Sequence, residues 1–395
     1  MSRHYQGETL FRPKEGKDAL YMIRNAARLW TVLLPALALL ALGLSWGREL
    51  PLALAIIVAL LLAGAVLAAV HHAEVIAHRV GEPFGSLVLA VAVTVIEVAL
   101  IVSLMISGGA QTGALARDTV FAAVMITCNG IVGLSLLTVT LKRRIAAFNA
   151  EGTGKALATV ATLATLSLVL PTFTTSAQGP AFSPAQLGFA AVASLALYAL
   201  FVVTQTVRHR DYFLPVPREA RSGEGQVSAT NDTVDPEEHA PRPSGRTALT
   251  SLGLLLVALV SVVGLAKVES PIIEGAVSSA GLPQAVVGVV IALLVLLPET
   301  IAAINAARRD QVQISLNLAL GSAMASIGLT IPAIAVASIW LEGPLLLGLG
   351  GTHMVLLALT VVVSTLTVVP GRATLMQSGV HLVLFAAFLF LAISP

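Results

Sequence analysis

Two glutamates, Glu97 and Glu299, each stand alone in the middle of a long apolar stretch. An ionised carboxylate at the centre of a bilayer costs about 2.5–3.5 kcal/mol on insertion scales, so such residues usually face a cavity or an ion path. The chain has 21 acidic residues, and the others fall in polar segments or near the ends of apolar stretches. We therefore expect these two glutamates to carry the chemistry.

The chemistry of such a pair follows from its charge. Two carboxylates that meet in a low-dielectric interior repel each other unless protons or a cation neutralise them. Alternate exposure of the pair to the two sides of a membrane would then exchange cations for protons. Carboxylate oxygens suit hard ions such as Ca²⁺ or Na⁺. Two glutamates match the charge of one divalent ion, and one of them could stay protonated beside a monovalent ion. Glu97 and Glu299 are thus the predicted metal-cation and proton ligands, and no resident cofactor is expected.

Neutral oxygens near the glutamates are candidate auxiliary ligands. Pro298 precedes Glu299 and has no amide hydrogen, so it frees the carbonyl of Leu294 within a helix. The alternative is a simple kink that aids packing. Polar side chains in the spans that follow the two glutamates are further candidates, and close packing with interhelical hydrogen bonds is their alternative role. They are Asn129, Asn317, Ser322 and Ser326.

The composition indicates a polytopic membrane protein, not a set of soluble domains. Of the 395 residues, 56% are hydrophobic and 11% are charged, and the mean hydropathy is +0.90. The apolar runs are continuous and lack the alternation of a membrane barrel, so the predicted fold is all-α. Eleven stretches are long enough to span: 29–47, 51–73, 84–107, 119–141, 156–176, 185–207, 248–267, 284–306, 313–339, 344–369 and 375–393.

Positive charges set the predicted orientation. With the N-terminus in the cytoplasm, the inside segments carry 20 of the 23 Lys and Arg residues. The three outside are Arg48, Arg117 and Lys267. Such a split is difficult to obtain with a wrong number of spans, because one missed helix inverts everything downstream. Eleven spans place the C-terminus outside.

The two glutamate helices show the same pattern. Glu97 follows Pro83 by 14 residues, and Glu299 follows Pro283 by 16 residues. At a rise of about 1.5 Å per residue, each carboxylate lies roughly 20–24 Å along its helix, near the middle of a hydrocarbon core about 30 Å thick. Two opposed helices could therefore bring the carboxylates together at the midplane.

The pattern continues beyond the glutamates and indicates a duplication. An Arg-Asp-x-Val sequence opens the next span in both halves, at Arg117 and at Arg309, and a helix rich in small and polar residues follows. Five spans per copy is an odd number, so the copies are predicted to be inverted, as in many secondary transporters. The predicted units are a cytoplasmic tail 1–28, a leading helix 29–47, repeats 51–207 and 248–393, and a flexible cytoplasmic linker 208–247 rich in Pro, Gly, Ser and acid.

A second polar cluster ends the 51–73 span. His71, Glu74 and His78 have the spacing of one helical face, and Glu82 follows. These four residues are candidates for proton access to the site. A zinc site, and with it a membrane metallohydrolase, is a weaker hypothesis because the HExxH spacing is lacking. An ordinary polar helix end is the remaining interpretation. His353 and His381 are interpreted as hydrogen-bonded packing residues.

Other classes of function are excluded. The net charge of +2 gives no reason to expect a nucleic-acid partner. Cys128 is the one cysteine, so the chain can form no internal disulfide or cysteine-based metal cluster. The sequence has no phosphate loop or nucleotide-binding motif, which argues against an ATP-driven pump. The expected partners are inorganic cations, protons and the lipid bilayer, and no enzymatic activity is expected.

Two segments resemble the repeat motifs of a known family. They are AEVIAHRVGEPFGSLVLAVAVTVIEVALI (73–101) and LLPETIAAINAARRDQVQISLNLALGSAMASIGLTIP (296–332). Together they are similar to the calcium/proton exchangers of the cation/Ca²⁺ antiporter superfamily, most of all to the bacterial ChaA-type antiporters, which exchange Ca²⁺, Na⁺ or K⁺ for protons. The resemblance covers essentially the whole chain.

The resemblance implies a fold and a function. Similar proteins have one leading helix and two inverted five-helix repeats, each with an essential glutamate in its second helix, here Glu97 and Glu299. It implies a secondary antiporter of the bacterial inner membrane that exports Ca²⁺ and/or Na⁺ or K⁺ in exchange for H⁺. Most calcium/proton exchangers have Gly-Asn-Ala-x-Glu before each carboxylate, where this chain has Val93-Thr94-Val95-Ile96-Glu97 and Leu296-Leu297-Pro298-Glu299. A cation channel or uniporter that uses the same carboxylates is the alternative function.

Overall fold

The fold is a bundle of long helices. The computed structural model describes residues 15–81, 84–108, 112–214, 243–341 and 343–395. The elements in chain order are α1 (Glu15–Ser45), α2 (Leu52–Val80), α3 (Phe84–Gly108), α4 (Leu115–Met125), the π-helix η2 (Ile126–Ile131), α5 (Val132–Arg143), β1 (Ile145–Ala147), α6 (Ala150–Ala164), the π-helix η3 (Thr165–Val169), α7 (Leu170–Phe173), α8 (Pro184–Val203), the π-helix η4 (Thr204–Arg208), the 3₁₀ turn η5 (Arg210–Phe213), α9 (Gly245–Ser279), α10 (Ala285–Val295), α11 (Leu297–Arg308), α12 (Val312–Ala337), α13 (Gly351–Val368), β2 (Arg372–Thr374) and α14 (Leu375–Ile393).

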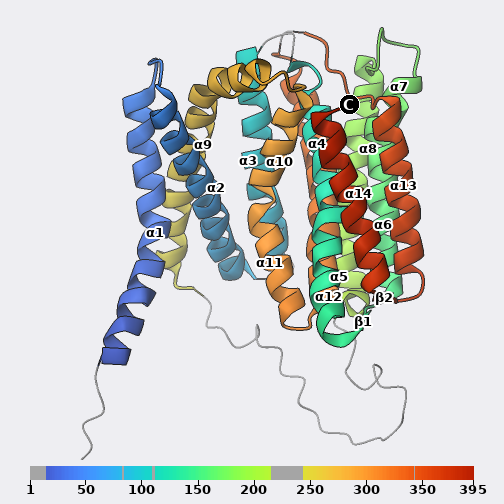
Figure 1. Ribbon diagram of the computed structural model, residues 1–395, viewed down its shortest axis with the longest axis horizontal. Helices are drawn as coiled ribbons and strands as arrows, with labels where there is room; N and C mark the ends of the chain where they lie inside the picture. The colour runs from blue at the N-terminus through green and yellow to red at the C-terminus, as the bar shows by residue number, and fades with distance from the viewer. Residues whose placement is uncertain (1–14, 82–83, 109–111, 215–242, 342) are drawn as a thin grey trace, which may run out of the picture.

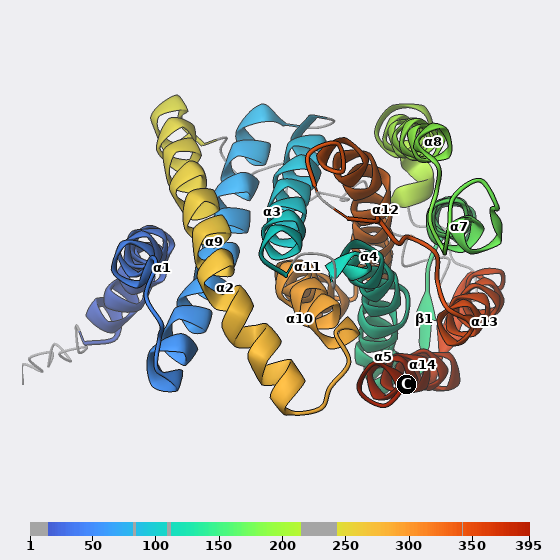
Figure 2. The same cartoon turned by 90° about the horizontal axis from the view of Figure 1, so that it is seen from above.

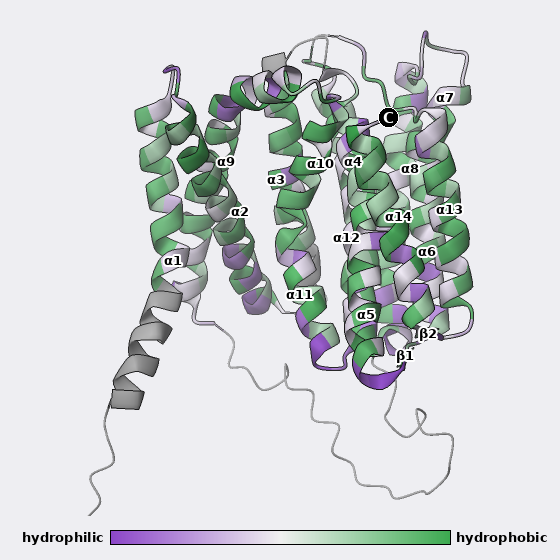
Figure 3. Ribbon diagram, in the orientation of Figure 1, coloured by the Kyte–Doolittle hydropathy of each residue, from purple (hydrophilic) through white to green (hydrophobic). Residues whose placement is uncertain are grey.

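The helices are long and apolar enough to cross a membrane, which confirms the polytopic helical prediction. Within the described residues, nine continuous helical segments meet this condition by length and composition. One bent pair, Ala285–Val295 with Leu297–Arg308, meets it when the two pieces are taken together, and Leu29–Ser45 is a shorter apolar helix. Apolar residues cover most of the bundle, and hydrophilic residues gather at its lower end (Figure 3). The count of eleven spans, which needs both additional segments, stays a prediction.

The proline before Glu299 breaks its span. α10 ends at Val295, α11 begins at Leu297, and the two pieces meet at 52°. Pro298 cannot donate a backbone hydrogen bond and crowds the preceding turn, so the helix restarts at this point. The break lies in the interior of the bundle, where a helix terminus needs polar surroundings.

Short extended segments join distant parts of the chain. β1 pairs with β2 in antiparallel register, with Ala146 opposite Ala373. At the other end of the bundle, near α7, Leu349 donates a backbone hydrogen bond of 2.8 Å to Leu168, and Gly348 donates one of 2.9 Å to Pro180 (Figure 1). The prediction of helix over 344–369 is wrong at its start, because residues 344–350 have no regular secondary structure and α13 begins at Gly351. This apolar loop instead donates backbone hydrogen bonds to other segments of the chain.

Two apolar cores hold the helices together. One joins α1, α2, α9 and part of α3, and the other is centred on α4, α5, α6 and α12. Viewed from above, α1, α2 and α9 lie on one side of the bundle, and α3, α10 and α11 lie between them and the remaining helices (Figure 2). The glutamate-bearing helices α3 and α11 thus lie at the junction of the two cores.

Candidate functional site

A cavity of about 170 Å³ lies at this junction. Glu97 of α3 and Glu299 of α11 both line it, so the structure brings the two glutamates to one cavity. α8 and α12 supply most of the remaining wall. The other lining residues are Leu89, Ala90, Val93, Thr94, Tyr198, Phe201, Val202, Gln205, Thr206, Val295, Leu296, Asn317, Leu318, Gly321, Ser322, Ala325 and Ser326.

Glu97 is held by a serine from the opposite half of the chain. Its side chain is only 4% exposed. The hydroxyl of Ser326 on α12 donates a 2.6 Å hydrogen bond to Oε1 of Glu97. A buried carboxylate needs such donors when it is ionised, and hydrogen bonds to charged groups are the stronger ones. The bond fixes the position of one carboxylate oxygen at the cavity wall.

Glu299 lies in the first turn of α11, directly after the helix break. The N-terminus of a helix carries a partial positive charge that favours a nearby anion. The Oε2 atom of Glu299 is buried and has no hydrogen-bond partner among the described residues. Glu97 lines the same cavity. A cation or a proton in the cavity would give this oxygen a partner.

Three of the candidate auxiliary ligands, all on α12, line the cavity. They are Asn317, Ser322 and Ser326. The Asn317 amide donates to the Phe213 carbonyl (2.7 Å), and its oxygen accepts from Gln313 (2.8 Å), so its orientation is set from two sides. Leu294 does not line the cavity, whereas the next two residues, Val295 and Leu296, do. The lining of the cavity therefore does not support the predicted role of the Leu294 carbonyl as a ligand.

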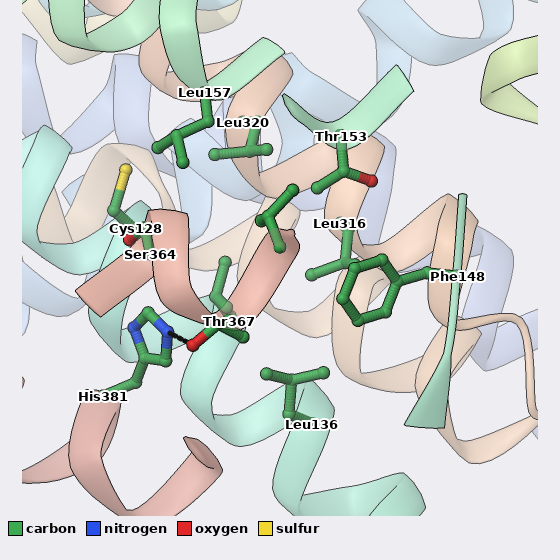
Figure 4. Close-up of a pocket in the computed structure, with 12 residues that line it drawn as sticks. Cys128, Leu136, Phe148, Thr153, Leu157, Leu316, Leu320, Ser364, Thr367 and His381 are labelled. Carbon is green, nitrogen blue, oxygen red and sulfur yellow. Dashed lines mark hydrogen bonds between the residues drawn. The ribbon is translucent and has the colours of Figure 1, made fainter. Parts of the chain in front are cut away.

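Asn129 does not line this cavity and belongs to another polar cluster. Its amide nitrogen donates to Thr360 on α13 (2.9 Å), and its oxygen lies 3.1 Å from Nδ1 of His381 on α14. Thr367 contacts the other ring nitrogen of His381 at 3.1 Å, beside a small cavity of about 20 Å³ that Cys128 and Ser364 also line (Figure 4). Asn129 thus serves the interhelical bonding that was its alternative role, because the π-helix η2 turns it toward α13 and α14.

The histidine cluster does not form a metal site. Within the described residues, no group of three or more His, Cys, Asp or Glu side chains is arranged to hold a metal ion. The zinc hypothesis is therefore wrong for His71, Glu74 and His78. α2 continues to Val80, and the His71 ring packs 5.8 Å from Trp30. Glu82 lies outside the described residues, and the proton-access role of the cluster stays a prediction.

His381 is the hydrogen-bonded packing residue that was predicted, and His353 packs against an aromatic ring. His381 is fully buried, and each of its ring nitrogens has a hydrogen-bond partner. The ring of His353 packs 4.8 Å from that of Phe121. Neither histidine lines the glutamate cavity.

Comparison with known proteins shows the family of this chain. The profile of the family described as sodium/calcium exchanger protein matches residues 50–207 and 250–394. The chain belongs to this family. It is accordingly a transporter and not an enzyme.

Relatives of the exchanger cover nearly its whole length. The protein y4hA of Sinorhizobium fredii (strain NBRC 101917 / NGR234) is 44% identical over 370 residues, which are 93% of this chain and 96% of the relative. The sodium-potassium/proton antiporter ChaA of Escherichia coli is 33% identical over 363 residues, 91% of this chain and 94% of the relative. Among solved structures, native YfkE covers 92% of this chain and is itself fully covered, with a TM-score of 0.65 and 14% identity. The H⁺/Ca²⁺ exchanger CAX covers 92% of this chain, with 87% of it covered, a TM-score of 0.64 and 16% identity.

Several residues that line the cavity were not predicted from the sequence. Gln205 and Thr206 line the cavity from η4, and Thr94 and Tyr198 line it from α3 and α8. Gln205 and Thr206 directly precede a basic segment, so they resemble the ordinary polar end of a span. The one available signal was a pair of polar residues inside the predicted span 185–207.

Proposed function

We propose that the protein is a secondary active antiporter that exports Ca²⁺ and/or Na⁺ or K⁺ in exchange for H⁺. Glu97 and Glu299 bind the cation and protons alternately, and Ser326, Ser322 and Asn317 supply neutral oxygens. The single observation that carries the proposal is that both glutamates, one from each half of the chain, line one cavity.

Charge balance explains the exchange. The cavity is lined mainly by apolar side chains, among which two free carboxylates would be costly. The buried Oε2 of Glu299 lacks a partner among the described residues, and Glu97 lines the same cavity. Protons and a cation therefore compete for the same oxygens, and binding of one displaces the other.

The transported cation is proposed from the relatives and from the oxygen ligands. The 33% identical relative from Escherichia coli is named a sodium-potassium/proton antiporter, and two neighbours in fold are Ca²⁺/H⁺ exchangers. Carboxylate, hydroxyl and amide oxygens suit all three ions. The cavity residues Thr94, Ser322 and Asn317 fit any of them.

The alternating-access arrangement and the membrane location are parts of the same proposal. Repeats 51–207 and 248–393 each supply one of the two cavity glutamates, Glu97 and Glu299. The charge distribution supports a cytoplasmic N-terminus and an outside C-terminus in a bacterial inner membrane. In the described structure, the start of α1 and the end of α14 lie at opposite ends of the bundle, as an odd number of spans requires (Figure 1).

Everted membrane vesicles test the function. Respiration acidifies their interior, and an antiporter should dissipate this pH gradient when Ca²⁺, Na⁺ or K⁺ is added. We expect a response in vesicles with the native protein and none with Glu97→Gln or Glu299→Gln. A cation flux that is unchanged when the proton gradient is collapsed would instead indicate a channel or uniporter. An unaltered response in both variants would remove the glutamates from the mechanism.

A further inference from the structure

A basic pocket lies at the end of the bundle that carries β1 and β2, away from the glutamate cavity. It has a volume of about 280 Å³ and is formed by the last turns of α5 and α11. Seven residues line it: Val139, Lys142, Arg143, Ala307, Arg308, Arg309 and Asp310. Both helix ends are strongly hydrophilic and lie side by side at the lower edge of the bundle (Figure 3).

The charge of the pocket is strongly unbalanced. Four of its side chains are cationic and one, Asp310, is anionic. Asp310 pairs with Arg143 at 3.2 Å, and both groups are partly exposed to solvent. The Lys142 ammonium donates to the Arg308 carbonyl at 3.4 Å, which connects α5 to α11. Arg308 and Arg309 are exposed, so their guanidinium groups are accessible to a ligand.

The backbone on both sides of the pocket is unusual. Within the described residues, the non-glycine residues with positive φ are Arg144, at 61°, and Asp310, at 68°. Such conformations are uncommon for residues with a side chain and persist where the surroundings hold them. They turn the chain directly after α5 and after α11, at the two edges of the pocket.

Exposed aliphatic residues lie next to the pocket residues in the sequence. Leu141 and Ile145 flank the basic residues in sequence and are 69% and 49% exposed. A site that combines several cations with exposed aliphatic side chains at a membrane boundary matches an amphiphile with an anionic head and hydrocarbon chains. Basic pockets between transmembrane helices on the cytoplasmic side are a recognised type of phospholipid headgroup site.

We propose that this pocket binds the phosphate headgroup of an anionic phospholipid, with Arg308, Arg309 and Lys142 on the phosphate and Leu141 and Ile145 against the acyl chains. The bound headgroup bridges α5, from the first half of the chain, to α11, the helix whose other end carries Glu299. The lipid thereby holds α11 in position at the cavity. The proposal concerns lipid binding and does not depend on which cation is transported.

Native mass spectrometry of the purified full-length protein tests lipid binding. We expect phosphatidylglycerol to remain bound more strongly than phosphatidylethanolamine or phosphatidylcholine of the same chain length. Each Lys or Arg near an anionic membrane surface strengthens binding to it roughly fivefold, so the removal of two should weaken phosphatidylglycerol binding by roughly 25-fold. The double variant R308Q/R309Q should show this loss. R208Q/R210Q, which removes two exposed arginines near the end of α8 and outside the pocket, should not.

A charge-conserving variant and two competitors complete the test. R308K/R309K changes the same two positions but keeps their positive charges, and we expect it to retain most of the lipid. If it does, the loss of lipid in R308Q/R309Q comes from the loss of charge and not from misfolding. Inorganic phosphate and a glycerophosphate without acyl chains serve as competitors. Equal lipid retention in R308Q/R309Q and R208Q/R210Q would overturn the proposal. So would equal retention of phosphatidylglycerol and phosphatidylethanolamine, or displacement of the lipid by millimolar inorganic phosphate, which would indicate a site for the free anion.

Discussion

Ser326 on α12 donates a 2.6 Å hydrogen bond to Glu97 on α3, across 229 residues of sequence. The bond joins the second half of the chain to the glutamate of the first half at the wall of the cavity. Both halves of the chain therefore contribute to the site. The ionised form of Glu97 gains most from this donor, because a carboxylate is a stronger acceptor than a carboxylic acid.

Removal of this donor should weaken cation binding. In Ser326→Ala, the ionised Glu97 loses a bond of a type worth about 1.5–3 kcal/mol, so we expect the apparent cation affinity to fall by roughly 10- to 150-fold. Protons then compete better, and the acidic limb of the transport profile moves to higher pH. The measurement is the half-saturating cation concentration in proteoliposomes at several pH values. Ser338→Ala is the matched control, because Ser338 follows the end of α12, donates its hydrogen bond to the Ala335 carbonyl and does not line the cavity. Equal effects of the two substitutions would contradict a special role for Ser326.

Glu74 on α2 is a candidate for proton access to the cavity. Glu74→Gln removes a side chain that can take up a proton and pass it on, so the transport rate should fall, most of all at high pH, where protons are scarce. Glu151→Gln, at an exposed position on α6, should leave the transport rate unchanged. A transport rate unaffected by Glu74→Gln would remove Glu74 from the group of proton-access candidates.

Substitution of Asn129 should lower the stability of the protein, whereas substitution of Asn317 should weaken cation binding. Asn129→Ala leaves His381 and Thr360 without their partner, and each unsatisfied buried group costs about 1–3 kcal/mol. We expect a lower melting temperature and an unchanged half-saturating cation concentration. Asn317→Ala, at the cavity wall, should raise that concentration. A change in cation affinity without loss of stability in Asn129→Ala would restore Asn129 as a ligand.

Two glycines of α6 offer a test of packing near the cavity. A Cβ atom at Gly152 would overlap the carbonyl of Tyr212 in η5, whereas the nearest atom to a Cβ at Gly154 is 3.7 Å away, on Val368. Gly152→Ala should therefore destabilise the protein by about 1–3 kcal/mol through overpacking. Gly154→Ala should stabilise it by up to about 1 kcal/mol, because alanine is the better helix former. Thermal unfolding followed by intrinsic fluorescence measures both, and similar melting temperatures would show that α6 and η5 are not in close contact.

The sequence was most informative where burial makes a polar residue costly. Glu97 and Glu299 stand out because an unneeded carboxylate in an apolar span is strongly disfavoured. Pro298 likewise predicted a free carbonyl or a kink in its helix, and the structure has two helices, α10 and α11, that meet there at 52°. The helical membrane fold followed from composition and continuous apolar runs. These features depend on local chemistry, which a single sequence contains.

The remaining cavity residues depend on tertiary structure. Gln205 and Thr206 line the cavity because α8 continues as the π-helix η4. No local sequence pattern predicts this change from α-helix to π-helix. Asn129 was a plausible ligand by residue type, but the π-helix η2 turns it toward His381. α9 extends to Ser279, so Glu269, expected near a span's end, lies buried within a helix. Helix length and rotation are set by packing partners, which are remote in sequence.

Competition at shared oxygens also predicts how cation binding varies with pH. If the cation displaces protons from the glutamates, its apparent affinity should fall about tenfold per pH unit for each proton displaced, below the pH at which the pair ionises. A slope of one therefore indicates one displaced proton, and a slope of two indicates two. Equilibrium binding of radioactive Ca²⁺ and Na⁺ to the purified protein at graded pH gives this slope. An affinity that is independent of pH across the acidic range would contradict competition.

The central claim is that a cation and protons occupy the same pair of carboxylates, Glu97 and Glu299. Proton release in a weakly buffered solution of the purified protein, followed with a pH-sensitive dye as Ca²⁺, Na⁺ or K⁺ is added, tests it most directly. We predict stoichiometric release of protons from the native protein, and none from the double variant Glu97→Gln/Glu299→Gln. Undiminished proton release from the double variant would contradict the claim.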